Sequence, residues 1–374
     1  MCHIRSGVSL ALVATAANCV PWLFGRKRAD DRCKGREQGV VVSTVGLNFV
    51  ESNIPNREFE RDGTLGIKLY KKPKLENSIM FCGWPGIGNI GITAIDTLRG
   101  VLRAEEFAEI EAWDFFAPRE VLIEKGLLKD LQFPSSKFYF QRIKDQDLIF
   151  FVGEQQPSEG RTQYAVGQKA YEMANLVLDV AQRFDCRRVY TSGAAVAQIH
   201  HTSNSKVWVV PNSKRLIEEV KQYENTILMS AMGGGKGQGF ISGLNGLLLG
   251  VAKKRGLEAI CVLGEIPYYL QAAPWPYPKG SRAVLELLAK ILGIDLDLSR
   301  VDELAKTVEK SIEQFLEALY NAEGVPPEVA DEIERLRDTG QTELGPITEE
   351  EQKKIMDHID ELFDQGGQKD ERHL

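Results

Sequence analysis

The residues best suited to chemistry are the glycines of Gly86-Ile-Gly88-Asn89-Ile-Gly91, which follow an apolar run and precede a helical pattern. This GxGxxG spacing matches the dinucleotide fingerprint, in which backbone amides and a helix N-terminus face a pyrophosphate. Asp114 lies near the end of the next predicted strand, where such a site has its ribose-binding acid. Pro85 removes one N–H, however, and the same glycines suit a tight turn that packs a helix against a strand. Two interpretations, a packing turn and a phosphate or nucleotide site, therefore stay open for Gly86, Gly88, Asn89 and Gly91.

A second glycine-rich loop, residues 233–239, also resembles an anion cradle. It departs from a P-loop because neither Ser nor Thr follows Lys236, and Ser230 replaces the first glycine. We therefore expect a loop with a solvated lysine. Ser192 follows an apolar strand, as the serine of a nucleophile elbow does, but Thr191 replaces the glycine that a GxSxG frame requires.

The remaining candidates are histidines and carboxylates. His200 and His201 are adjacent, so on a strand their rings would point to opposite faces, and we expect a polar loop feature rather than a metal site. Glu154 and Glu265 each end an apolar strand, where ligand crevices of α/β sheets lie. They are a possible carboxylate pair or two solvated glutamates. The sequence thus predicts no catalytic set and no metal site.

The elements around these residues alternate between strands and helices from Gly66 onward. Helical periodicity is clearest over residues 161–184, and buried strands are expected at 78–82, 188–192 and 259–263. Residues 137–143 and 147–152 are expected to form a hairpin. This alternation predicts an α/β fold with a mostly parallel sheet covered on both faces. After the α/β region, residues 299–319 carry one apolar helical stripe. Thr348 and Glu351 form a capping box, which predicts a last helix.

Charge is distributed unevenly along the 374 residues. The net charge of −7 argues against a nucleic-acid binder that relies on phosphate neutralisation. Residues 1–36 carry seven basic and two acidic side chains, whereas residues 295–374 carry nine basic and 23 acidic ones. We therefore expect a disordered or mis-started leader at 1–60, an α/β domain at 61–294, a helical appendage at 295–323 and an acidic helical extension at 324–374.

The cysteines and the N-terminus indicate the compartment. Six scattered cysteines without a CxxC pair are typical of free thiols in a reducing environment. The apolar run from Val8 to Phe24 is short for a membrane span and is interrupted by Asn18 and Pro21. We expect a cytoplasmic protein without membrane contact, and whether residues 1–40 are translated stays open.

Four stretches resemble the proteasome-assembly-chaperone family, whose members are also called ATP-grasp-like or carboxylate–amine-ligase-like proteins. The stretches are FCGWPGIGNIG, VYTSGAA, GFISGLNGLLLGVAKKRGLEAICVLGE and the helix at 299–320. The resemblance implies a three-layer, phosphorylase-like α/β/α sandwich with a C-terminal helical appendage and a homo-oligomer. It also implies that the chain chaperones proteasome-like subunits or another protein client, without a cofactor. Members that dock on the proteasome end in hydrophobic-Tyr-any residue, whereas this chain ends Glu371-Arg372-His373-Leu374, so docking through that tail is not predicted.

Two functions remain to be compared. The first is a non-catalytic, protein-binding assembly factor that acts as a homo-oligomer. The alternative is a nucleotide- or phosphate-binding enzyme, either a carboxylate–amine ligase or a phosphorylase-like transferase, that uses the loop from Gly83 to Gly91. A ligase would need Mg²⁺ carboxylates and a phosphorylase would need cations placed on phosphate, and neither set is visible in the sequence.

Overall fold

A computed structural model describes residues 66–159, 164–229, 240–321 and 327–339. The loop at 233–239 and the helix expected after Thr348 lie outside the described residues. Within the described part, no helix is both long enough and apolar enough to cross a membrane.

The centre of the fold is a nine-stranded sheet with the order β1-β3-β6-β7-β2-β8-β11-β9-β10. Its strands are β1 (Ile67–Leu69), β2 (Ser78–Gly83), β3 (Glu105–Ile110), β6 (Ser136–Ile143), β7 (Gln146–Gly153), β8 (Cys186–Ala197), β9 (Val207–Pro211), β10 (Thr226–Leu228) and β11 (Glu258–Pro267). The four pairs β7–β2, β2–β8, β8–β11 and β9–β10 are parallel, and the other four are antiparallel. The predicted α/β class is confirmed, but the sheet is mixed rather than mostly parallel. Apolar runs reveal where strands lie and not their direction.

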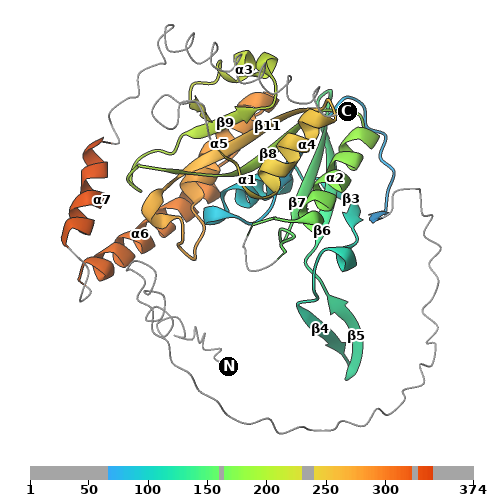
Figure 1. Ribbon diagram of the computed structural model, residues 1–374, viewed down its shortest axis with the longest axis horizontal. Helices are drawn as coiled ribbons and strands as arrows, with labels where there is room; N and C mark the ends of the chain where they lie inside the picture. The colour runs from blue at the N-terminus through green and yellow to red at the C-terminus, as the bar shows by residue number, and fades with distance from the viewer. Residues whose placement is uncertain (1–65, 160–163, 230–239, 322–326, 340–374) are drawn as a thin grey trace, which may run out of the picture. The chain divides into compact units, whose positions relative to one another are not determined.

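Helices pack on both faces of this sheet (Figure 1). On one face lie α1 (Ile90–Val101) and α5 (Pro278–Leu292), and on the other lie α2 (Gln168–Arg183) and α4 (Gly243–Lys254). β2 contributes side chains to the hydrophobic core on each face. Ile79 and Phe81 belong to the core on the side of α1 and α5, and Met80 and Cys82 belong to the core on the side of α2 and α4. This alternation is the period of a strand that is buried on both faces.

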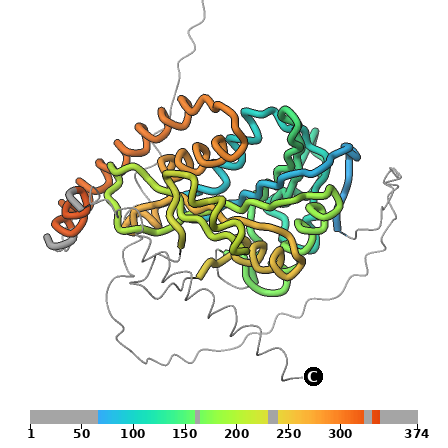
Figure 2. The backbone as a smooth tube through the Cα atoms, turned by 90° about the horizontal axis from the view of Figure 1, so that it is seen from above, coloured from blue at the N-terminus to red at the C-terminus, as the bar shows by residue number. Residues whose placement is uncertain are grey.

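The C-terminal helical region predicted from the sequence is present. α6 (Ser299–Tyr320) buries Val301, Val308 and Ile312 in the core cluster of α1 and α5, and Figure 2 shows it, in orange, beside α5. α7 (Pro327–Thr339) follows and buries Ile333. α7 lies within residues 324–374, for which an acidic helical extension was expected, and α3 (Lys214–Val220) is a short helix after β9. The proposed domain boundaries stay a prediction.

A separate hairpin leaves the sheet between β3 and β6 (Figure 1). It consists of β4 (Glu120–Glu124) and β5 (Leu127–Gln132), which pair with each other in an antiparallel two-stranded sheet. Asp130 and Lys129 interrupt the alternation of β5, and a bulge shifts the register there.

The turn between β2 and α1 brings helix and sheet unusually close. A Cβ on Gly91 would lie 2.1 Å from the carbonyl oxygen of Ser192 in β8, so only glycine allows this approach. Gly88 has a positive φ of 56° and packs below Ile266 and Tyr277. Gly86, in contrast, is extended and has no atom within 4 Å of its Cβ position. The turn therefore contains two glycines that packing requires and one that it does not.

This contrast predicts the stability of two variants. Gly91→Ala should lower the free energy of unfolding by roughly 1–3 kcal/mol or more, because the methyl group forces α1 away from the β8 backbone. Gly86→Ala should change it by less than about 0.5 kcal/mol, since the position is open. Urea unfolding followed by circular dichroism measures both values. Equal stability of the two variants would contradict the close packing of α1 on β8.

Candidate functional site

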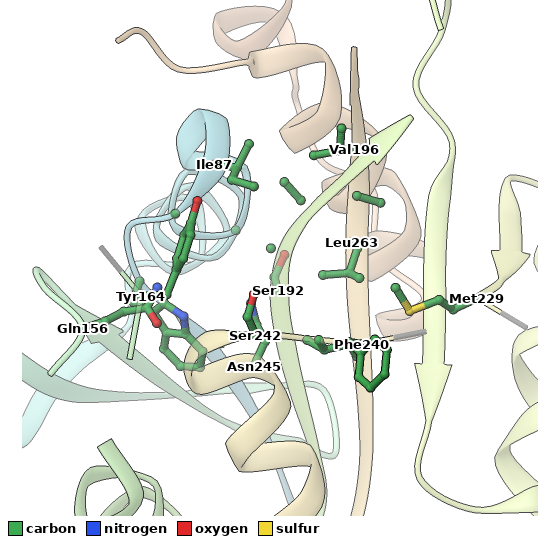
Figure 3. Close-up of a pocket in the computed structure, with 17 residues that line it drawn as sticks. Ile87, Gln156, Tyr164, Ser192, Val196, Met229, Phe240, Ser242, Asn245 and Leu263 are labelled. Atoms are coloured by element: carbon green, nitrogen blue, oxygen red, sulfur yellow. The ribbon is translucent and has the colours of Figure 1, made fainter. Parts of the chain in front are cut away.

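A pocket of about 270 Å³ lies where the parallel strands β2, β8 and β11 end (Figure 3). Its position follows from unequal strand lengths. β2 pairs with β8 only as far as Cys82 and Thr191, whereas β8 continues to Ala197. Residues 192–196 of β8 therefore line an open space beside the strand, and the loop after β2 covers it. Carboxyl ends of parallel strands are the usual place for ligands in α/β sheets.

Gln156 holds three walls of the pocket together. It is 6% exposed, and its Nε2 donates to the carbonyl of Pro85 at 2.8 Å. Its Oε1 accepts from the backbone N–H of Ala165 at 3.2 Å and of Leu244 at 3.1 Å. One side chain thus joins the loop after β2, the segment before α2 and the first turn of α4. Gln156 was not predicted from the sequence, because a glutamine after a strand carries no signal of its own.

The four residues predicted in the glycine turn do not line one common site. Gly86 and Gly91 line the pocket, whereas Gly88 is buried beneath Tyr277. Asn89, in a left-handed conformation, lines a separate, open hollow that also includes Glu154. Their role in cofactor binding stays a prediction.

The strand order differs from that of a dinucleotide domain. β3 is separated from β2 by β6 and β7 and runs antiparallel to β6. Asp114, in a short helical turn after β3, is therefore about three strand spacings, roughly 14 Å, from the glycine turn. In a dinucleotide site the corresponding strand lies beside the first one, so Asp114 is not placed as a ribose-binding acid.

The two candidate glutamates are not a pair. β2 and β8 separate the strands that Glu154 and Glu265 end. Glu154 forms an ion pair with Arg119 at 3.3 Å, and both side chains are about half exposed. Glu265 is buried and accepts hydrogen bonds from Trp208 Nε1 at 2.9 Å and from the backbone N–H of Lys206 at 2.8 Å. It anchors β9 to β11, so a buried structural carboxylate replaces the solvated one that we expected.

The nucleophile candidates lack activation. Ser192 lies inside β8 rather than at a strand-to-helix turn, and its hydroxyl has no hydrogen-bond partner. Burial raises the pKa of the Cys186 and Cys261 thiols to about 12, so both remain protonated and unreactive. Among the described residues, no three His, Cys, Asp or Glu side chains gather as metal ligands would.

The His200–His201 pair lies in a loop, as the sequence predicted, and both residues are buried. The residues are 0% and 2% exposed, and their ring centroids are 4.1 Å apart because the segment is a loop and not a strand. His201 Nδ1 lies 2.9 Å from the Tyr269 hydroxyl. Lys279 of α5 donates to the His201 carbonyl at 2.7 Å and pairs with Glu309 of α6 at 2.9 Å.

This environment keeps both imidazoles neutral. Burial, with the nearby His200 and Lys279, lowers the pKa of His201 to about 3. Burial also lowers the pKa of His200, and Arg337 of α7 adds to the effect while Glu334 opposes it. In the unfolded chain a histidine titrates near pH 6.5. The folded pKa is therefore the lower one, so the stability is complete above about pH 6.5 and decreases as the pH falls toward 3.

The histidines should make unfolding sensitive to mild acid. Between pH 6.5 and 5, His201 should reduce the free energy of unfolding by up to about 1.4 kcal/mol per pH unit, because the unfolded state alone takes up the proton. His201→Asn keeps a polar atom near Tyr269 but does not titrate, so its stability should depend less on pH. Urea unfolding at pH 7.5 and 5.5 compares the two chains. Parallel pH profiles would contradict the neutral, buried assignment.

Comparisons with known proteins identify a family and several proteins that this chain resembles. The PAC2 family matches residues 80–316. PbaB of Pyrococcus furiosus, an archaeal proteasome activator, is 30% identical over 67% of this chain and 97% of its own, with a TM-score of 0.56. An uncharacterized protein of Methanocaldococcus jannaschii is 29% identical over 69% of this chain and 92% of its own.

A more distant structure shares the fold. The proteasome-assembly chaperone homologue Rv2125 of Mycobacterium tuberculosis is 18% identical over 68% of this chain and 99% of its own, with a TM-score of 0.52. The family match covers more than half of the chain, including the glycine turn, β8, α4 and most of α6. The chain therefore belongs to the PAC2 family, which includes homologues of proteasome-assembly chaperones.

Proposed function

We propose that the protein is a non-catalytic assembly factor, which acts as a homo-oligomer and binds subunits of a proteasome or of a similar ring. Its similarity to PbaB over nearly the whole of that chain supports a partner related to the proteasome. Among the described residues the hydroxyl of Ser192 has no base beside it, and no three His, Cys, Asp or Glu side chains gather as metal ligands would.

The observation that carries the proposal is the apolar surface of the β4–β5 hairpin. Five of its large apolar side chains are 40–74% exposed, although a strand pair in a folded protein normally buries at least one face. These residues are Val121, Leu122, Ile123, Leu127 and Leu128. A concentration of exposed apolar residues on one projecting element is typical of a protein–protein contact.

A second copy of this chain is the occupant that we infer for the hairpin. An isolated two-stranded hairpin is only marginally stable in water, so a cover should be present whenever the protein is folded. A client subunit is bound only part of the time, whereas another copy is always available. Each end of β4 also carries a glutamate, and Lys129 pairs with Glu124, which gives the apolar surface a charged rim.

Charged substitutions on the hairpin should dissociate the oligomer. We expect Ile123→Lys, Leu127→Lys and Leu128→Lys together to convert the wild-type oligomer to monomers at micromolar concentration, because three lysines cannot be buried at an apolar interface. The control carries Val101→Lys and Tyr171→Lys, which change exposed apolar residues of α1 and α2 and should leave the oligomer intact. Size-exclusion chromatography with light scattering measures the mass.

Two outcomes would contradict this part of the proposal. A wild-type chain that is monomeric at all concentrations would show that a second copy does not cover the hairpin. A triple variant that keeps the wild-type mass, while its circular dichroism spectrum remains native, would place the oligomer interface elsewhere.

The proteasome-related client can be tested directly. Affinity purification of the tagged full chain from its native source should retain proteasome α-subunits, identified by mass spectrometry, at near-stoichiometric amounts. The hairpin triple variant provides a comparison: it should retain less, because a monomer presents one binding site where the oligomer presents several. Enrichment of other proteins without any proteasome subunit would contradict the client class.

A further inference from the structure

The pocket at the ends of β2, β8 and β11 has no part in the assembly function proposed above. Its walls come from segments far apart in the sequence, including Ile87 after β2, Tyr164 before α2, Ser192 in β8 and Ser242 before α4 (Figure 3). A volume of about 270 Å³ is near the lower end of the range for small-molecule sites. The space is therefore large enough for a molecule with a single ring.

Three polar groups of the pocket residues have no partner. They are Nε1 of Trp84, Oγ of Ser192 and Oδ1 of Asn245. Trp84 and Ser192 are 2% and 1% exposed, so both side chains are almost fully buried. Most buried polar side-chain atoms in native proteins do have a partner, and one left without costs about 1–3 kcal/mol. The neighbouring Gln156, in contrast, uses both ends of its amide within the protein. These three groups belong to residues that line one cavity, and a small molecule bound there could supply their hydrogen bonds.

Glycines around these groups allow α4 and β8 to lie close together. A Cβ on Gly193 would lie 2.5 Å from Asn245 Nδ2 and 3.2 Å from Leu263, so glycine is needed for Asn245 to lie over β8. Likewise a Cβ on Gly246, in the first turn of α4, would lie 2.1 Å from the Ile241 carbonyl oxygen. Glycines thus keep the amide of Asn245 at the cavity, on a rigid helix rather than a loop.

The types of the three groups define the ligand. Trp84 donates a hydrogen bond, Asn245 Oδ1 accepts one, and Ser192 does either. The remaining walls, such as Ile87 and Leu263, are apolar, and none of the described residues that line the cavity is charged. We propose that the pocket binds a small neutral molecule, in which an amide-like group that both donates and accepts is attached to an apolar or aromatic body.

Benzamide and benzoate provide a matched pair of probes, because they share a ring and differ in the neutral amide against the carboxylate. Titration of the full chain by isothermal calorimetry should give saturable binding of benzamide in the millimolar range and at least tenfold weaker binding of benzoate. Ser192→Ala and Asn245→Leu should each weaken benzamide binding about tenfold, the loss of one hydrogen bond. Ser136→Ala is the control, because its hydroxyl is also buried and unpartnered but does not line the pocket.

A second measurement separates binding from folding. Ser192→Ala removes an unsatisfied hydroxyl, so its melting temperature without ligand should equal or exceed that of the wild type, while the stabilisation by benzamide decreases. Tighter binding of benzoate than of benzamide would overturn the neutral assignment and favour an anion at the glycine turn. Benzamide binding that is absent, or that is equal in wild type and both pocket variants, would overturn the site itself. Neither result depends on oligomer mass or on the client.

Discussion

The contact between Gly91 and the carbonyl of Ser192 is the constraint on which the rest of the structure depends. It sets the distance between α1 and β8, and no residue with a side chain fits there. Because α1 lies so close to the sheet, α5 can pack on α1, and α6 can pack on α5 in turn. α5 also packs directly on β11, so α1, α5 and α6 together cover this face.

The same contact explains why a cavity exists beside β8. β8 extends beyond its pairing with β2, so its backbone past Thr191 has no neighbouring strand on that side. The loop after β2 crosses the gap, held at one end by Gly91 and at the other by Gln156. Side chains fill such a gap incompletely when the elements around it are fixed by backbone contacts. The pocket is thus a consequence of strand length and of two anchoring points.

Local patterns predicted most elements but not their neighbours. The buried runs of β2 and β11 and the hairpin of β6 and β7 were recognised because apolar periodicity is a property of short segments. The mixed sheet and the separation of Glu154 from Glu265 were not, because both depend on strand order. The burial of His200 and His201 was not predicted either, because it depends on contacts with distant segments such as Tyr269 and Lys279. The glycine turn was identified as a candidate site, but its pocket partners Gln156 and Asn245 come from distant segments and carry no local signal.

The β4–β5 hairpin and the pocket require different kinds of partner. The β4–β5 hairpin exposes apolar area without enclosing a volume, so only a large partner could remove it from water. The pocket encloses a volume lined by residues that carry unpartnered polar groups, and only a small molecule fits inside it. A ligand there would contact α4, β8 and the loop after β2 at once, but not the hairpin, which leaves the sheet between β3 and β6. Binding at the two surfaces should therefore be separable by substitution, even where one influences the other through the shared sheet.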